Sequence, residues 1–344
     1  MEKRLLTKDA FAAALERLAA AKRVLGPVQD GDNVVFGPLE PGRQPALGYR
    51  NTRNAPKNAL FPHTETLMRF TRTPKGVECA GQGDDPAETV VVVRPCDAQS
   101  FLLLDRVFDQ PGCRDPYYVG HRERTTVVAL ACPQPPYAAC FCTSVGGDPV
   151  PAAPAGVDVL ATDLGGGGGE ILAEFLTPKG EALLSFFEGQ AADGQADARK
   201  AQAGEKARAG IRSQVPAREV LPILQKNFDH PFWAGLHGKC LACGTCTYIC
   251  PTCHCFDISD EAKKDDGVRL RSWDSCMFPL FTKEASGHNP RSSQKERWRQ
   301  RVMHKFRYIP ENFDLVGCVG CGRCVLNCPV NLDIRKIVQD VAKI

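Results

Sequence analysis

The strongest constraint on this chain is a cysteine pattern that occurs twice in its C-terminal third. The first copy has the spacing C-x2-C-x2-C-x3-C-P and comprises Cys240, Cys243, Cys246 and Cys250. The second copy repeats this spacing with Cys318, Cys321, Cys324 and Cys328. Glycines stand beside these cysteines and suit tight turns that leave backbone N–H groups close to the sulfur atoms. We therefore expect a fold that gathers eight thiols into two groups.

The spacing is typical of cysteines that ligate a pair of [4Fe–4S] clusters. In this arrangement three closely spaced cysteines surround one cubane, and the fourth reaches the other cluster. The first cluster is therefore predicted to take Cys240, Cys243, Cys246 and Cys328. The second is predicted to take Cys318, Cys321, Cys324 and Cys250. Structural zinc is the alternative, but zinc motifs rarely run four cysteines with this spacing and a closing proline, twice.

The rest of the composition is ordinary for a soluble globular protein. The 344 residues suffice for two domains, and the formal net charge of +3 indicates no particular partner. The 17 cysteines are odd in number and many fall in C-x-x-C runs, which favours metal-bound thiolates over disulfides. No apolar run approaches the roughly 20 residues that span a bilayer, and the N-terminus lacks a signal-peptide pattern. We expect a cytoplasmic protein without membrane contact.

The N-terminal half has the pattern of a small α/β domain. Apolar β-branched runs at 89–93 and 125–131 flank a helical pattern at 97–108, which predicts a parallel strand pair. The fold class expected is an α/β domain with a small parallel or mixed sheet, followed by an α-helical ferredoxin-like dicluster domain with a long insertion between its two motifs. We place the α/β domain at 1–190, a linker and helix at 191–235, and the dicluster domain at 236–344.

A second group of cysteines lies in the N-terminal half. Cys96 and Cys132 each follow one of the two predicted strands, and Cys140 and Cys142 come soon after. Because the carboxyl ends of parallel strands meet at one edge of the sheet, we expect these four to converge. They predict a third [4Fe–4S] cluster, with zinc or buried free thiols as the alternatives.

The residues at the start of the 97–108 helix have further predicted roles. The positive end of the helix dipole favours a thiolate at Cys96. Asp97 is an alternative oxygen ligand, although its place at the start of the helix favours an N-cap role instead.

Five cysteines remain outside these sets. Cys253, Cys255 and Cys276 do not complete a standard site, so we expect them to pack near the first motif, with additional metal as the alternative. Cys79 and Cys113 carry no pattern and are predicted to be buried thiols.

Residues 288–308 are strongly basic and contain one tryptophan. Clustered Lys and Arg along a helix are the electrostatic footprint of nucleic-acid binding, so a metal-stabilised scaffold or nucleic-acid-binding protein is the alternative function. We prefer a solvated helix or protein-docking surface, in which the arginines also offset the negative charge of the clusters. No Gly-x-Gly-x-x-Gly and no Ser/His/Asp or His-Glu-x-x-His arrangement is present, so no catalytic centre is expected in this chain.

Several segments resemble a known family. RPCDAQSFLLLDRVF, CFCTSVGG, CLACGTCTYICPTCHCFD, RSWDSCMFPLFT, GHNPR, RQRVMHKFRY and GCVGCGRCVLNCPVNLDIRKI are similar to the beta subunit of cytoplasmic sulfhydrogenases. They are equally similar to the corresponding dicluster subunit of anaerobic sulfite reductases and to related dicluster proteins of flavin oxidoreductase complexes. The resemblance spans about residues 88–145 and 236–340.

The resemblance implies an electron-transfer subunit of a multi-subunit oxidoreductase. Its partners would be a flavin subunit that handles NAD(P)H and a catalytic subunit of hydrogenase, sulfite reductase or heterodisulfide reductase type. The eight C-terminal cysteines carry over as cluster ligands. The sequence leaves the terminal substrate open.

Overall fold

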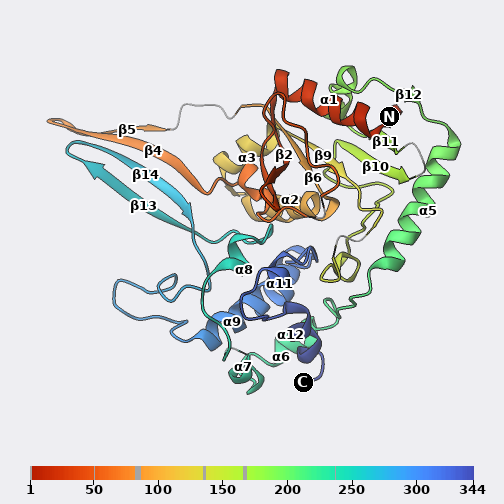
Figure 1. Cartoon of the computed structure of the whole chain (residues 1–344). Coiled ribbons are helices and arrows are strands. Elements are labelled where there is room, and N and C mark those ends of the chain that lie inside the picture. Colours follow the sequence, from red (N-terminus) through yellow and green to blue (C-terminus); the bar gives the residue numbers. More distant parts are fainter. Residues whose placement is uncertain (1, 50, 82–86, 135–136, 166–168, 237) are drawn as a thin grey trace.

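The structure is a computed structural model that describes residues 2–49, 51–81, 87–134, 137–165, 169–236 and 238–344. It has three parts: a large mixed sheet with helices on both faces, an arm of two β-hairpins, and a C-terminal bundle of short helices (Figure 1). The long helix α5 (Gly194–Gly210) runs along one side between the sheet and the bundle. The mixed α/β class and the ferredoxin-like C-terminal part agree with the sequence prediction.

The large sheet has eight strands in the order β12-β1-β11-β10-β9-β6-β2-β3. Its four central neighbours, β2, β6, β9 and β10, run parallel to one another. The predicted parallel pair is therefore present, with Val93 of β6 opposite Ala129 of β9. The strands are β1 (Glu2–Thr7), β2 (Arg23–Asp30), β3 (Asn33–Pro38), β6 (Thr89–Val93), β9 (Thr125–Leu130), β10 (Val159–Gly165), β11 (Glu170–Phe175) and β12 (Gln190–Ala191).

Both faces of this sheet are buried, as continuous apolar strands require. Successive side chains of a strand point to opposite faces. Val90 and Val92 of β6 face a core that includes helix α1 (Lys8–Ala21), while Val91 and Val93 face a core that includes α2 (Pro95–Phe108) and α3 (Pro116–Glu123). The sheet therefore holds the carboxyl ends of β6 and β9 rigidly, at the point where Cys96 and Cys132 follow.

The arm joins segments from the two halves of the chain. Strands β4 (Thr64–Thr73) and β5 (Gly76–Gly81) form one hairpin, and β13 (Phe256–Lys263) and β14 (Asp266–Trp273) form the other. Strand β4 pairs with β14 in an antiparallel four-stranded sheet. The pairing crosses the predicted boundary at 191–235, so the two parts are joined by backbone hydrogen bonds as well as by the linker. A small hairpin, β7 (Asp109–Gln110) and β8 (Cys113–Arg114), follows α2.

A buried charge cluster fixes the base of the arm against α3. Arg271 of β14 donates to Glu65 of β4 at 2.6 Å and also to Asp115, the N-cap of α3. His121 of α3 lies 2.9 Å from the other oxygen of Glu65. Burial alone would raise the pKa of Glu65, but the hydrogen bonds from His121 and Arg271 outweigh it and lower that pKa.

We expect Glu65→Gln to destabilise the protein by about 1–3 kcal/mol, because a buried hydrogen-bonded charge is lost. Since the folded pKa of Glu65 is depressed below its ordinary value of 4.5, its contribution is present above that pH and is lost as pH falls through the folded pKa. Urea unfolding at pH 7 and at pH 4 checks this. The difference between wild type and variant should shrink at the lower pH, and an unchanged difference contradicts the assignment.

The C-terminal bundle packs short helices around a third core that includes Trp233, Trp298 and Phe306. The helices are α6 (Leu221–Lys226), α7 (Phe232–Gly235), α8 (Thr245–Tyr248), α9 (Gln294–Met303), the π-helical turn η4 (His304–Tyr308), α10 (Ile309–Phe313), α11 (Arg323–Leu326) and α12 (Ile334–Val341). Short single turns elsewhere are η1 (Pro56–Ala59), η2 (Cys142–Val145), α4 (Pro178–Glu181) and η3 (Leu184–Phe186). Among the described residues no helix combines the length and apolar character needed to cross a bilayer.

Candidate functional site: three cysteine centres

The four cysteines assigned to the second cluster line one internal cavity. Cys318, Cys321 and Cys324 come from the second motif, and Cys250 comes from the end of the first. Gly320 and Gly322 have φ of +64° and +74°, which lets the chain turn sharply around the cavity. The cysteine spacing predicts that the last cysteine of the first motif joins the three cysteines of the second motif. The fold places Cys250 with Cys318, Cys321 and Cys324 in this way.

Burial dominates the electrostatics of this centre. It raises the pKa of Cys318 and Cys324, and that of Cys321 to about 12. Cys250 differs, because hydrogen bonding from Cys253 lowers its pKa well below the ordinary value. Thiols held this far from water ionise only when cationic groups or a bound metal stabilise the thiolate.

The first motif lies nearer the surface. Gly244 (φ +71°) turns the chain into α8, and the ring of Phe278 packs against this glycine. Burial raises the pKa of Cys246, the charge of Arg301 opposes this rise, and Cys240, Cys250 and Cys243 lie close enough to act on the thiol as well. Cys243 is exposed. The structure therefore brings three cysteines of the first motif together, with one edge open to solvent.

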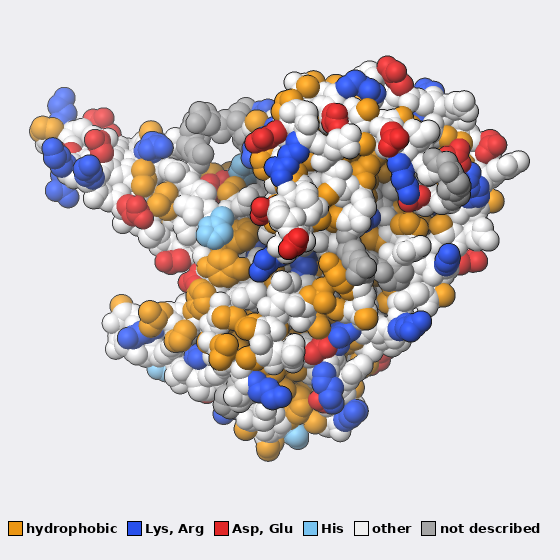
Figure 2. Space-filling model, viewed as in Figure 1, with side chains coloured by type: hydrophobic (Ala, Val, Ile, Leu, Met, Phe, Trp, Pro, Cys, Tyr) orange, Lys and Arg blue, Asp and Glu red, His pale blue; other side chains and the backbone are white. Residues whose placement is uncertain are grey.

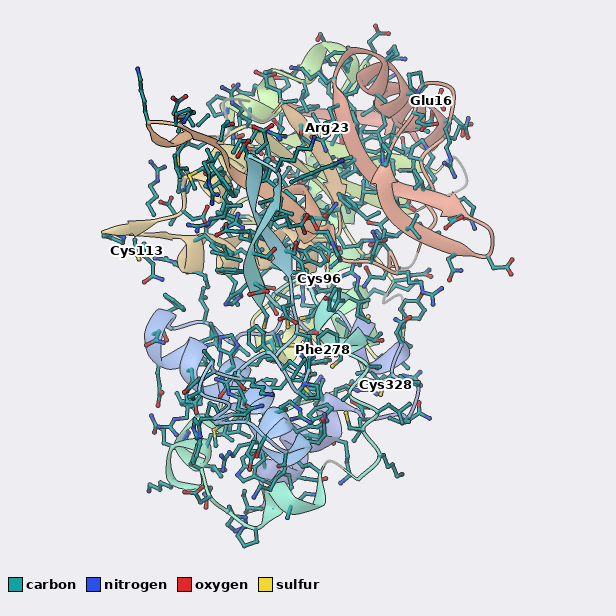
Figure 3. All side chains as sticks on the ribbon, turned by 90° about the vertical axis from the view of Figure 1, so that its left-hand side faces the viewer. Glu16, Arg23, Cys96, Cys113, Phe278 and Cys328 are labelled. Carbon is teal, nitrogen blue, oxygen red and sulfur yellow. The ribbon has the colours of Figure 1, made fainter. Side chains whose placement is uncertain are left out.

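Cys328, the predicted fourth ligand of the first cluster, follows α11, which packs against α8. The backbone N–H of Leu332 donates to its sulfur at 3.2 Å. Cys240 receives comparable bonds from the N–H of Ala242 at 3.4 Å and from Nε2 of Gln294 at 3.0 Å. Donors of this kind stabilise thiolate sulfur and tune a metal bound to it. Figure 3 shows Cys328 in the helical part, away from Cys96.

The four N-terminal cysteines converge as the parallel strands predicted. Cys96, Cys132, Cys140 and Cys142 line a second cavity, together with Arg94 and Cys321. Cys96 lies at the junction of the α/β part and the helical part (Figure 3). Arg94 is buried and donates to the carbonyls of Leu130 and Ala131 at the end of β9. This cavity and the second-motif cavity share Cys321, so the two centres are adjacent.

The predicted thiolate character of Cys96 is absent in this environment. Burial, followed by the charge of Asp97, raises its pKa well above the ordinary value. The expected helix-dipole effect is therefore outweighed, since desolvation of a fully buried thiol acts more strongly than one helix terminus.

Asp97 is held by an ion pair. The helix begins at Pro95 with Arg94 as N-cap, so the predicted N-cap role of Asp97 is wrong. Nη1 of Arg323 donates to Oδ1 of Asp97 at 2.5 Å, and Nη2 donates to Oδ2 at 2.9 Å. Arg323 lies between Cys321 and Cys324 in the second motif and also reaches Thr52. This buried pair locks the second motif to the helix that carries Cys96.

The basic segment 288–308 turns a row of cations inward. Arg297, Arg301 and Lys305 recur every four residues through α9 and η4 and are all buried. Arg301 donates to the sulfur of Cys253 at 3.6 Å, and Lys305 donates to that of Cys250 at 3.4 Å. The predicted offset of thiolate charge by this segment therefore has a structural basis. Cations in these positions cannot reach a phosphate backbone.

The remaining cysteines divide into two kinds. Cys79 and Cys113 are exposed, so the prediction that they are buried is wrong; they lie on β5 and β8, short edge hairpins with no core beneath them. Cys113 lies at the periphery in Figure 3. Cys253, Cys255 and Cys276 lie beside the first motif as expected, and a hydrogen bond from Cys276 lowers the pKa of Cys255 to about 6.

The donor set suits iron–sulfur cubanes, because four of the assigned cysteine thiols line each of two cavities. In a cubane each thiolate binds a separate iron atom, so the ligands surround the cluster. Sequence reasoning missed Lys57, Arg94, Gln294 and Arg323, which surround the cysteines; among these only the Arg94-Pro-Cys and Cys-Gly-Arg323-Cys neighbourhoods offered a signal.

Comparison with known proteins agrees with this donor set. Residues 239–332 match the family model of the 4Fe-4S dicluster domain. The chain is also similar to sulfhydrogenase 2 subunit beta of Pyrococcus furiosus, with 29% identity over 98% of this chain and 97% of that protein. No solved structure matches the chain. The resemblance found in the sequence is thus confirmed: residues 239–332 match the 4Fe-4S dicluster domain, and the whole chain is similar to a sulfhydrogenase beta subunit.

Proposed function

We propose that this chain is the electron-relay subunit of a cytoplasmic multi-subunit oxidoreductase. It passes electrons between a flavin subunit that handles NAD(P)H and a catalytic subunit of hydrogenase, sulfite reductase or heterodisulfide reductase type. The observation that carries the proposal is the adjacency of the cysteine centres. The N-terminal cavity and the second-motif cavity share Cys321, and Cys140 donates to the Cys321 carbonyl at 3.8 Å.

The ligand sets of the proposal follow the cysteine spacing. Bound [4Fe–4S] clusters supply one-electron carriers. The first is held by Cys240, Cys243, Cys246 and Cys328. The second is held by Cys318, Cys321, Cys324 and Cys250. A third is held by Cys96, Cys132, Cys140 and Cys142 rather than by Asp97, because both oxygens of that carboxylate accept bonds from Arg323.

The protein's own groups support such a relay in three ways. Arg301 spans the first two centres, since it donates to the carbonyl of Cys246 at 2.9 Å and its charge acts on Cys250. The buried Arg323–Asp97 pair fixes the second centre against the third. At the other end, the first motif reaches solvent at Cys243 and Leu241, the latter 66% exposed. Electrons therefore have a surface point of exchange.

An apolar face near the first motif suits partner docking. Leu280 is 71% exposed and follows Phe278, which packs against Gly244 of the first motif. Figure 2 shows a notch between the hairpin arm and the C-terminal part, bordered by apolar side chains. We infer that one partner subunit binds here, next to the surface-exposed centre. The division into domains at 1–190, 191–235 and 236–344 remains part of the proposal.

We expect the anaerobically reconstituted chain to bind at least about 12 iron atoms with matching sulfide. Cys132→Ser/Cys142→Ser should lower the count by about four, and Cys318→Ser/Cys324→Ser should lower it by about four. Iron and sulfide analysis with EPR after dithionite reduction measures this. A colourless chain with stoichiometric zinc contradicts the redox function, and an N-terminal variant with unchanged iron contradicts the third centre alone. The partner subunits are tested by which flavoprotein and metalloprotein co-purify.

A further inference from the structure

The sulfur of Cys250 has a charged donor and a thiol donor beside it. Nζ of Lys305 donates to this sulfur at 3.4 Å, and the Cys253 thiol donates to it as well. The hydroxyl of Thr252 lies 3.2 Å away. Cys250 is the residue that crosses from the first motif to the second centre, so donors that act on its sulfur act on the second centre.

The ammonium of Lys305 is fixed by three hydrogen bonds. Besides the Cys250 sulfur, its partners are the hydroxyl of Thr252 and the carbonyl of Gly317, both at 2.8 Å. These bonds use all three N–H donors of an ammonium group. None of the three partners is a carboxylate, and Lys305 is only 5% exposed. Its positive charge therefore acts on the sulfur with little screening.

Backbone packing places Lys305 at this sulfur. The residue lies in the π-helical turn η4, and single π-helical turns within α-helices occur frequently at functional sites. The N–H of Gly317 donates to the Lys305 carbonyl at 2.7 Å. A Cβ on Gly317 would lie 2.8 Å from the Lys305 Cα, so the two segments approach as closely as a glycine allows. The second motif begins directly after Gly317, which holds the cation in place against the ligands that it faces.

Burial alone would make the second centre hard to reduce. Reduction of a [4Fe–4S] cluster adds one electron, and hence one negative charge, without forming or breaking a bond. Among the ligands of this centre, Cys250 is 8% exposed and Cys321 9%. Removal from water disfavours the more negative form of a group, whereas a nearby cation favours that form. A buried ammonium beside the ligands therefore offsets the cost of burial.

We propose that Lys305 sets the reduction potential of the second centre through Cys250, holding it above the value that burial alone would give. The Cys253 thiol adds a smaller effect in the same direction. Hydrogen bonds to ligand sulfur and the charge around a cluster both tune its potential. The inference rests on the proposed electron relay and names the residues that keep its buried second centre reducible. It also gives Cys253, which belongs to none of the three ligand sets, a role as a donor to a ligand.

The first centre has neutral donors in place of the ammonium. Cys240 accepts a bond from the amide of Gln294 at 3.0 Å, and Cys328 accepts one from a backbone N–H. Hydrogen bonds from charged donors are roughly twice as strong as those from neutral donors. Arg301 does not distinguish the two centres, because its charge acts on cysteines of both. Removal of the Lys305 charge should therefore change the second centre selectively.

The test is a redox titration of the anaerobically reconstituted full chain, followed by EPR. Lys305→Met keeps an unbranched side chain of similar length but loses the charge. The equilibrium constant for one-electron reduction of the second centre should then fall about tenfold, because one charged hydrogen bond is lost. For a one-electron couple this is a shift of about 59 mV to lower potential. Cys253→Ala removes a neutral donor and should lower the same constant about threefold.

The matched control is Lys336→Met, which removes the same charge from an exposed side chain that pairs with Asp340 on the surface of α12, and no shift is expected. The signal of the second centre is the one that the Cys318→Ser/Cys324→Ser variant lacks. An unchanged potential of that signal in Lys305→Met overturns the inference, as does an equal shift at all centres, which indicates a structural role alone.

If Lys305→Met does not hold its clusters, Cys253→Ala decides the question, and an unchanged potential of the second centre in that variant overturns the inference. A wild-type chain that binds no clusters overturns the proposed relay itself. The two failures are thus distinguished, because a shift can be sought only where the wild-type signals are present.

Discussion

Gly320→Ala is expected to abolish cluster binding at two centres with a single methyl group. Gly320 has φ of +64°, and a Cβ there would lie 2.5 Å from the backbone N of Cys142 and the carbonyl carbon of Phe141. The left-handed conformation costs about 1–2 kcal/mol for a residue with a Cβ. Forcing the chains apart adds about 1–3 kcal/mol. Because the clashing atoms are backbone, no side-chain rotation relieves the contact.

The same contact joins the second motif to the N-terminal cysteine loop. Phe141 stands between Cys140 and Cys142 in the sequence, and its N–H donates to the Gly320 carbonyl at 2.9 Å. Displacing this loop should lower iron content by about eight atoms, four from each adjacent centre. The measurements are iron analysis and urea unfolding under anaerobic conditions. The control is Gly235→Ala in α7, where a Cβ meets nothing within 4 Å and no loss is expected. Retention of full iron by Gly320→Ala would show that the two centres are not coupled through this contact.

Arg323→Met is expected to destabilise the protein by about 3–5 kcal/mol, because it leaves Asp97 as an unpaired buried charge. Asp97 is 1% exposed and Arg323 2%, and two hydrogen bonds join them. The double variant Arg323→Met/Asp97→Leu should lose less unfolding free energy than the two single variants lose together. In the double variant neither charge is left buried without its partner. Urea unfolding of all four proteins measures the coupling.

The pair also predicts a specific effect on metal content. Asp97 adjoins Cys96, and Arg323 lies between Cys321 and Cys324, so the single variant should lose iron from both neighbouring centres while the first motif keeps its cluster. Arg269→Met is the matched control, because its partner Asp260 is exposed on the hairpin arm and little change is expected. If the double variant lost as much unfolding free energy as the two single variants together, the ion pair would not join the two centres.

Spacing along the chain determined much of the candidate site. The repeated motif predicted that Cys250 shares a ligand set with Cys318, Cys321 and Cys324, and these four cysteines line one cavity. The parallel strands at 89–93 and 125–131 placed Cys96 and Cys132 at one sheet edge, and the cavity there includes both. Both inferences rest on local geometry: the turns between nearby ligands in one case, and the shared direction of adjacent strands in the other. Short sequence patterns are enough to predict geometry of this kind.

Contacts between distant segments were decided only by the tertiary structure. Nothing near Lys57 or Thr52 in the sequence marks them as neighbours of the cysteine motifs, yet Lys57 reaches Cys253 and Thr52 reaches Arg323. The sequence likewise carries no pattern that predicts the pairing of β4 with β14, because either strand could pair with the edge of many other strands. Such contacts depend on how two separately folded surfaces fit together, and that fit is a property of packed shape and buried charge, which no spacing of residues in one segment encodes.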